Sequence, residues 1–118
     1  MILGIGIDIV ELKRIRRLLE KNNRFLKRVL TEAEQEKAMT LTAHRRTEYV
    51  AGRFAAKEAF SKANKTGIGK LGFQQIEIIN CANGAPQMQV EGMEDIYIHL
   101  SISHSGELAI AQVLLEKR

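Results

Sequence analysis

The chain has 118 residues, 45% of them hydrophobic and 27% charged, with a formal net charge of +4. This length predicts one domain, residues 1–118, able to bury roughly two-thirds of its unfolded surface. No apolar run reaches the about 20 residues of a membrane span, the N-terminus lacks signal-peptide features, and the single cysteine, Cys81, cannot form an internal disulfide. We therefore expect a cytoplasmic protein without a membrane partner.

Residues 2–10 alternate in polarity and predict a β-strand. One face carries Gly4, Gly6 and Asp8, and the other is wholly apolar, consisting of Leu3, Ile5, Ile7 and Ile9. The glycines predict a trough into which another element packs closely. Asp8 lies at its end and has two interpretations. It could cap the next helix, because Glu11 follows three residues later, or it could serve a site beside the trough.

Three helical segments are expected next. Residues 12–19 are amphipathic, and the chain is expected to bend near Asn22 and Asn23. The sequence "TEAE", residues 31–34, is a capping box that starts another helix. The longest helix is expected to begin at "TLTAHR" and to run to about Ala63. Gly52 inside it predicts close contact with another backbone, since glycine otherwise costs up to ~1 kcal/mol there.

Basic residues are concentrated between positions 13 and 28. Eight of the eighteen lysines and arginines lie there, and only Glu20 opposes them. A solvated helix face is one explanation, although such faces normally mix both signs. A docking surface for an acidic partner is the other.

A stripe on the longest helix changes from apolar to ionic. Val50, Phe54, Glu58 and Lys62 are each four residues apart and share one face. Glu58 and Lys62 could simply form an ion pair. Alternatively, Glu58 and Asp8 could bind a divalent cation, because Mg²⁺ prefers one or two carboxylates with water and phosphate oxygens. Lys62 would then be free to bind phosphate.

The remaining chain predicts two hairpins. Gly67, Gly69 and Gly72 follow the helix and indicate a C-cap and turn; close approach to a ligand is the weaker alternative. "FQQIEIIN" and "PQMQVEG" flank the turn signal Asn83-Gly84. Residues 96–103 alternate, Ser105-Gly106 permits a turn, and "ELAIAQVLLE" predicts a buried strand. The whole is an α+β fold, with a long helix and shorter helices packed on a mostly antiparallel sheet.

His104 ends the alternating strand beside an exposed turn. It could be structural, or its imidazole could reach a ligand phosphate or accept a proton. Cys81 has no partner that spacing identifies, and we interpret it as structural or incidental.

Three blocks together resemble one enzyme family. "GIGIDIVEL", "FAAKEAFSKA" with the following "GIG", and "SISHSGELAIAQV" are similar, in this order, to blocks of the holo-acyl-carrier-protein synthases, the small bacterial phosphopantetheinyl transferases. The likeness covers nearly the whole chain. It implies the 4′-phosphopantetheinyl transferase fold and transfer of the 4′-phosphopantetheine arm of coenzyme A to a serine of apo acyl carrier protein. The by-product would be adenosine 3′,5′-bisphosphate, and the activity would support fatty acid biosynthesis.

The resemblance also implies residue roles. Asp8 and Glu58 match the Mg²⁺ ligands and, with Lys62, the catalytic residues. The residues similar to coenzyme A contacts are Arg45, Arg53, Lys62, Gly67, Gly69 and His104. The basic residues between positions 13 and 28, which we call the basic surface, correspond to the carrier-protein docking surface of the family. The matching residues are Arg14, Arg17, Arg24, Phe25 and Arg28. The family likeness further suggests a homotrimer with interfacial active sites, and the sparse polarity of the last strand agrees. If Ala111 or Val113 faces a neighbour, charge introduced there should disrupt assembly and activity together.

Two other functions are alternatives to this one. A nucleic-acid-binding module would use the basic residues, but aromatic residues are only 5% and tryptophan is absent, so base-stacking platforms are scarce. A structural oligomer with a salt-bridged helix is the other. Neither explains why Asp8 and Glu58 accompany the basic surface, and we expect no nucleic-acid partner.

Overall fold

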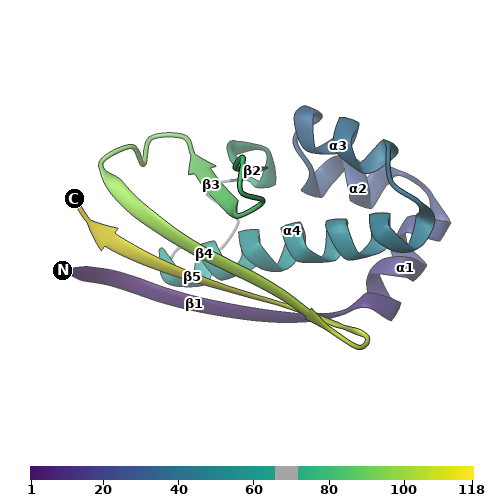
Figure 1. Ribbon diagram of the computed structural model, residues 1–118, viewed down its shortest axis with the longest axis horizontal. Coiled ribbons are helices and arrows are strands. Elements are labelled where there is room, and N and C mark those ends of the chain that lie inside the picture. Colours follow the sequence, from purple (N-terminus) through teal and green to yellow (C-terminus); the bar gives the residue numbers. More distant parts are fainter. Residues whose placement is uncertain (66–71) are drawn as a thin grey trace.

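A long helix lies on a three-stranded antiparallel sheet (Figure 1). The computed structural model describes residues 1–65 and 72–118, so Gly67 and Gly69 lie outside the described residues. The helix is α4 (Ala43–Ala63), and the strands are β1 (Ile2–Glu11), β5 (Leu108–Lys117) and β4 (Ile96–Ser105), in the spatial order β1-β5-β4. The predicted α+β class is confirmed.

Three short helices pack against α4: the first lies beside the N-terminal end of α4, and the other two lie on the side that faces away from this sheet (Figure 1). They are α1 (Leu12–Lys21), α2 (Arg24–Val29) and α3 (Glu32–Met39). The capping box is confirmed: the Thr31 hydroxyl accepts from the Glu34 N–H, and the Glu34 carboxylate accepts from the Thr31 N–H at 2.8 Å. The Thr42 hydroxyl caps α4 by accepting from the Arg45 N–H, without a reciprocal bond. Such a cap contributes about 1 kcal/mol.

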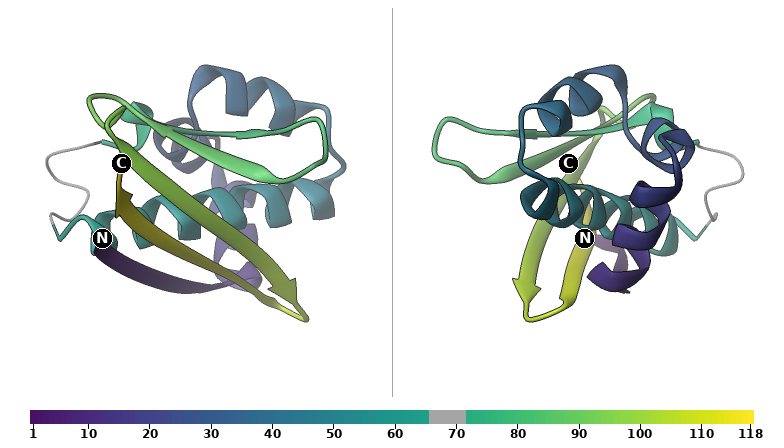
Figure 2. Two further views of the ribbon diagram at one scale, coloured as in Figure 1. Left: turned by 60° about the vertical axis from the view of Figure 1, so that its left-hand side comes forward. Right: turned by 90° about the vertical axis from the view of Figure 1, so that its right-hand side faces the viewer.

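A separate two-stranded sheet consists of β2 (Ile76–Asn80) and β3 (Pro86–Val90). The predicted turn is confirmed, because Gly84 takes a φ of 87°, which favours glycine. The start of "FQQIEIIN" is not a strand but a short 3₁₀ helix, η1 (Phe73–Gln75), where the Gln75 side chain accepts from the Gly72 N–H at 2.8 Å. Figure 2 shows this hairpin on the same side of the larger sheet as α4.

The last strand, β5, is central, and the condition that Ala111 or Val113 faces a neighbour is not met. Ala111 and Val113 are fully buried on the face that α4 covers, together with Ala109. They therefore do not face a neighbour, because the strand's small side chains pack against the chain's own helix. The opposite face of β5 carries the partly exposed Ile110 and Leu114.

The outer face of β1 is apolar and uncovered by the described chain. Leu3 is 39% exposed, and Ile5, Ile7 and Ile9 are 58–59% exposed. Ile5 lies opposite Leu114 in the ladder and Ile9 opposite Ile110, so the patch continues onto β5. A contiguous apolar patch of this kind marks an interaction surface. Within the described residues, no helix has both the length and the apolar character needed to cross a membrane.

Candidate functional site

The glycines of β1 bring the strand against the backbone of α4. A Cβ on Gly4 would overlap the carbonyl oxygen of Ala63, and one on Gly6 would overlap that of Ala59 and lie 2.7 Å from the Ala63 nitrogen. Only glycine permits this approach. The trough predicted from the alternation is thus filled by the long helix, and Asp8, on the same strand face, lies against it.

Asp8 forms an ion pair with Lys62. The Lys62 Nζ lies 3.0 Å from the Asp8 Oδ1 and also donates to the Ile7 carbonyl at 3.0 Å. The alternative that Asp8 caps the next helix is wrong, because Glu11 is the N-cap of α1 and no side chain caps it. The alternative of a Glu58–Lys62 pair is also not what forms, since the partner of Lys62 is Asp8.

Glu58 lies in an environment that disfavours its charge. Burial raises the pKa of its carboxyl group first, and the nearby charge of Asp8 raises it further. Lys62, Arg14 and Arg28 lower the pKa in part. Asp8, Glu58 and Lys62 therefore form one group, which we call the carboxylate site, and two arginines of the basic surface lie within electrostatic reach of it.

The carboxylate site offers a metal only two carboxylates. Among the described residues, no group of three or more histidines, cysteines, aspartates and glutamates could hold a metal ion. A cation bound here would complete its shell with water and with oxygens of a bound molecule, as Mg²⁺ prefers. A divalent charge would also remove the Asp8–Glu58 repulsion that raises the pKa of Glu58.

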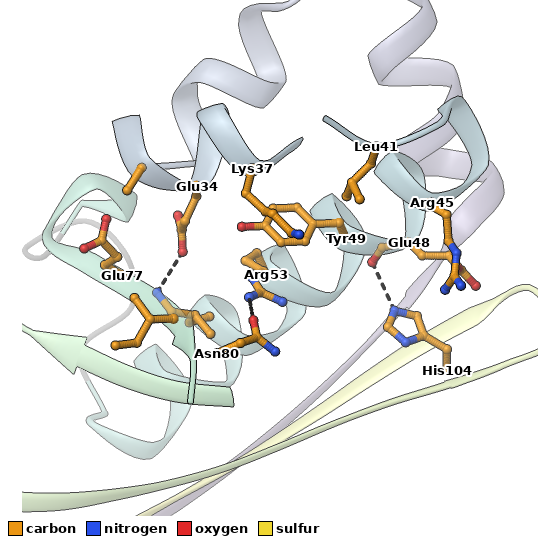
Figure 3. A pocket seen from close by; sticks show the side chains of 13 residues that line it. Glu34, Lys37, Leu41, Arg45, Glu48, Tyr49, Arg53, Glu77, Asn80 and His104 are labelled. Atoms are coloured by element: carbon orange, nitrogen blue, oxygen red, sulfur yellow. Dashed lines mark hydrogen bonds and ion pairs between the residues drawn. The ribbon is translucent and has the colours of Figure 1, made fainter. Parts of the chain in front are cut away.

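A second group of the predicted residues lines a cavity of about 720 Å³ (Figure 3). Arg45, Arg53 and His104 all border it, with Tyr49 and Asn80 beside them. The Arg53 Nη2 donates to the Asn80 Oδ1 at 2.6 Å, and its guanidinium lies 4.1 Å from the centre of the Tyr49 ring. The Nε of Arg53 is buried without a hydrogen-bond partner within the described chain. This cavity can accept an anionic group next to an aromatic ring.

His104 is held by the helix rather than pointing freely into the turn. Its Nε2 lies 3.0 Å from the carbonyl oxygen of Glu48, and since a carbonyl only accepts, Nε2 carries the proton. Gly52 makes room for it, because a Cβ there would lie 3.5 Å from the imidazole and 3.2 Å from the Ile102 side chain. The prediction that Gly52 contacts another backbone is wrong; it contacts side chains of β4.

The carboxylate site and the cavity lie on different faces of α4. Arg53 and Glu58 are five residues apart, which separates them by about 140° around a helix. None of the carboxylate-site residues lines the cavity. The structure therefore groups the predicted residues into two sets, and within one chain it does not bring the two sets together.

The basic surface is solvent-exposed, as expected of a docking surface. Arg14 and Arg17 on α1 and Arg24 and Arg28 on α2 are all exposed. Phe25 differs, because it is only partly exposed and its ring packs 5.5 Å from that of Phe54. Phe25 therefore anchors α2 on α4 and is less available to a partner than the exposed arginines.

Sequence reasoning missed the fully buried charges. Lys57 is 0% exposed and Glu34 is 2% exposed, and their side chains form an ion pair of 2.6 Å. The spacing of Val50, Phe54, Glu58 and Lys62 suggested that Glu58 lies on the buried face of the helix, yet Glu58 is only partly buried. A signal was present in "AAKEAF", where Lys57 stands among small and apolar residues.

The sequence is similar to those of known proteins over nearly its whole length. The sequence model of the 4′-phosphopantetheinyl transferase superfamily matches residues 4–113. The chain is 60% identical over 118 residues to a holo-[acyl-carrier-protein] synthase of Oceanobacillus iheyensis, covering 100% of this chain and 99% of the relative.

Two solved structures extend the similarity to three dimensions. A holo-(acyl-carrier-protein) synthase from Bacillus anthracis, crystallised in complex with CoA (3′,5′-ADP), has a TM-score of 0.93 and 53% identity, covering 100% of this chain and 99% of that one. A Helicobacter pylori enzyme of the same name, in complex with coenzyme A, has a TM-score of 0.84 and 36% identity, covering 95% and 99%.

Proposed function

Because this chain belongs to the 4′-phosphopantetheinyl transferase superfamily and to its holo-[acyl-carrier-protein] synthases, we propose the following reaction. The chain transfers the 4′-phosphopantetheine arm of coenzyme A to a serine of apo acyl carrier protein, with Mg²⁺, and releases adenosine 3′,5′-bisphosphate. The observation that carries the proposal is the carboxylate site, where a 3.0 Å Lys62–Asp8 pair lies beside a carboxyl group whose pKa is raised.

The residues of the carboxylate site fit Mg²⁺ and a diphosphate. Asp8 and Glu58 would hold the ion, which when bound neutralises diphosphate charge and polarises the phosphorus under attack. Lys62 is 55% exposed at its side chain, so its ammonium group can turn to an arriving phosphate oxygen. Phosphoryl transfer depends mainly on such positioning and charge stabilisation.

The bond changes are simple in this proposal. The serine hydroxyl oxygen forms a bond to the β-phosphorus of coenzyme A, and the bond from that phosphorus to the bridging oxygen breaks. The serine proton passes to a base, and the departing oxygen leaves as part of adenosine 3′,5′-bisphosphate with a negative charge, which Lys62 is placed to stabilise. The nucleotide part of coenzyme A would bind in the cavity, where Arg45 and Arg53 offer donors to phosphate and His104 lines the wall.

Mass spectrometry tests the proposed function directly. Incubation with coenzyme A, Mg²⁺ and apo acyl carrier protein should add the mass of one phosphopantetheine arm to the carrier. Omitting Mg²⁺ and adding a chelator should abolish that gain. An unmodified carrier at high enzyme concentration, across several carriers, would contradict the proposal.

A homotrimer explains how two separated groups of residues serve one substrate. The carboxylate site and the cavity lie on different faces of α4, and a neighbouring subunit that supplies one of them would let one coenzyme A touch both. Closed cyclic assembly lets every subunit do so at once. The uncovered apolar face of β1 offers the contact surface.

Charge on the outer face of β1 should disrupt assembly and activity together. We expect Ile7→Asp to give a folded monomer that loses most transfer activity, because the Ile7 side chain is 58% exposed while burial of a carboxylate against a second copy is costly. Sedimentation and the transfer assay measure the two effects. Met39→Asp, at an apolar side chain 50% exposed elsewhere, is the control, and a fully active wild-type monomer would refute the trimer.

Charge reversal on α2 should weaken carrier binding selectively. We expect Arg24→Glu to raise the KM for carrier protein about tenfold and to leave that for coenzyme A nearly unchanged, since rim charges mainly govern encounter. Arg24 suits this test better than Arg14, which acts on Glu58. Lys117→Glu makes the same charge change on an exposed side chain of β5 and should have little effect; a matched loss there would count against the docking surface.

A further inference from the structure

The one fully buried lysine of α4 joins segments that are distant in sequence. The Lys57 Nζ lies 2.6 Å from the Glu34 Oε1, 2.7 Å from the Val29 carbonyl oxygen and 3.1 Å from the Phe73 carbonyl oxygen. An ammonium group has three N–H donors, so each has one partner. Lys57 thereby connects α4 to α3, to the last residue of α2 and to η1.

Glu34 extends these connections. Its Oε1 also accepts from the Thr31 N–H at 2.8 Å, and its Oε2 accepts from the Ile78 N–H of β2 at 2.8 Å. Burial lowers the pKa of Lys57, and the Glu34 carboxylate opposes that fall. The pair is thus a hydrogen-bonded centre between five elements, α2, α3, α4, η1 and β2, rather than an isolated ion pair.

Lys57 and Gln74 together bind the C-terminal carbonyls of α2. The Lys57 Nζ donates to the carbonyl oxygen of Val29. The Gln74 Nε2 lies 2.8, 3.2 and 2.8 Å from the carbonyl oxygens of Lys27, Arg28 and Leu30, to which it donates. A helix leaves its last carbonyls without internal partners, and a cation there is favourable. Because α2 has only six residues, it cannot be stable alone, and these contacts hold it in place together with the buried Leu26 and Val29 and the packing of Phe25 on Phe54.

The placement of α2 matters for the proposed reaction. α2 carries the exposed Arg24 and Arg28, and the charge of Arg28 acts on Glu58. Lys57 is the residue before Glu58 on α4, so a single turn of α4 holds α2 on one side and presents the carboxylate site on another. Lys57 therefore binds the helix that carries two of the docking arginines and directly precedes a residue of the carboxylate site.

We propose that Lys57 is a positioning residue that, with Glu34, holds α2 in register with the carboxylate site, so that a carrier bound at Arg28 presents its serine to the reacting phosphate. The inference rests on the proposed function. It assigns Lys57 no contact with substrate: its effect is transmitted through α2.

A double-mutant cycle on carrier binding tests this role. Lys57→Met/Glu34→Gln removes both buried charges together, which avoids leaving one unpaired. Gln74→Ala loosens the same helix end from an exposed position and does not threaten the fold. In each background, Arg28→Gln probes α2, and Arg14→Gln probes α1, which Lys57 does not contact. The measured quantity is the Kd for apo carrier protein.

The expected result is a loss of coupling that is confined to α2. Arg28→Gln should weaken binding about fivefold in the wild-type background and less than about twofold in the two altered backgrounds, which is the non-additivity of residues that act together. Arg14→Gln should raise the Kd by the same factor in the wild-type background and in both altered backgrounds. Amide hydrogen exchange of α2 should accelerate at least about tenfold relative to α1.

Other outcomes overturn the proposal in identifiable ways. If Arg28→Gln keeps its full effect in Gln74→Ala and in the double variant, α2 does not depend on these contacts. If Arg14→Gln loses its effect equally, Lys57 supports the whole fold and not the register of α2. If the double variant does not fold, Gln74→Ala decides alone. If the wild type binds no carrier, the proposed function fails, and the hydrogen exchange of α2 still tests Lys57.

Discussion

Glu58→Gln is expected to lower the transfer rate by about 10²–10³-fold, the usual cost of removing one charge-stabilising group from such a site, while leaving the fold intact. Asp8→Asn should have a similar effect. A neutral amide is a poor ligand for Mg²⁺, and Asp8→Asn also removes the 3.0 Å ion pair with Lys62. Both variants should lose the increase in Tm that Mg²⁺ gives the wild type.

Glu58→Gln should also raise the free energy of unfolding at neutral pH when no metal is present. The pKa of Glu58 is raised in the folded chain, first by burial and then by Asp8. The folded chain therefore binds more protons than the unfolded chain between the ordinary glutamate pKa and the raised one, and stability falls as pH rises through that window. Glutamine does not titrate, so the advantage of Glu58→Gln should be present above the window and absent below it.

Thermal unfolding with and without Mg²⁺, at pH values on both sides of the window, measures these effects beside the transfer assay. Glu36→Gln is the matched control, because Glu36 is an exposed glutamate on α3. It should change neither the rate nor the response to Mg²⁺. If Asp8→Asn and Glu58→Gln each keep a near wild-type transfer rate at limiting Mg²⁺, the hypothesis of a two-carboxylate metal site is wrong.

Gly6→Ala is expected to damage both stability and activity. The new Cβ would overlap the Ala59 carbonyl oxygen and lie 2.7 Å from the Ala63 nitrogen, and backbone atoms inside a helix cannot turn aside. β1 must therefore move away from α4, which we expect to cost about 1–3 kcal/mol, or about 4–15 °C in Tm. The shift separates Asp8 from Glu58 and Lys62, so activity should fall further than stability alone explains.

Gly72→Ala is the control for the loss of a glycine. A Cβ on Gly72 would meet nothing closer than 4.0 Å, and its φ of −67° suits alanine. Its Tm should stay close to that of the wild type. If Gly6→Ala unfolds at the wild-type temperature and keeps the wild-type rate, the close contact of β1 with α4 does not position the carboxylate site.

Much of the local structure was determined by the sequence alone. The capping box at Thr31, the alternation of β1 and the turn at Gly84 were all predicted and are confirmed. Each depends on groups only a few residues apart, whose geometry is decided by backbone sterics and neighbouring side chains. The three sequence blocks likewise identified the family, because the identity of their residues needs no coordinates.

Only the tertiary structure decided which charge of α4 is buried and which residues meet. Small and apolar side chains are buried almost all round this helix, among them Val50, Ala51, Phe54, Ala56 and Ala59, because it lies between the sheet on one side and α1–α3 on the other (Figure 1). A helix buried on both sides shows no clear polar face, so its periodicity does not reveal the orientation of each side chain. Lys57 was missed for that reason. The partner of Lys62 was missed for another: Asp8 lies 54 residues away in the sequence, and only the close packing of β1 on α4 brings the two together.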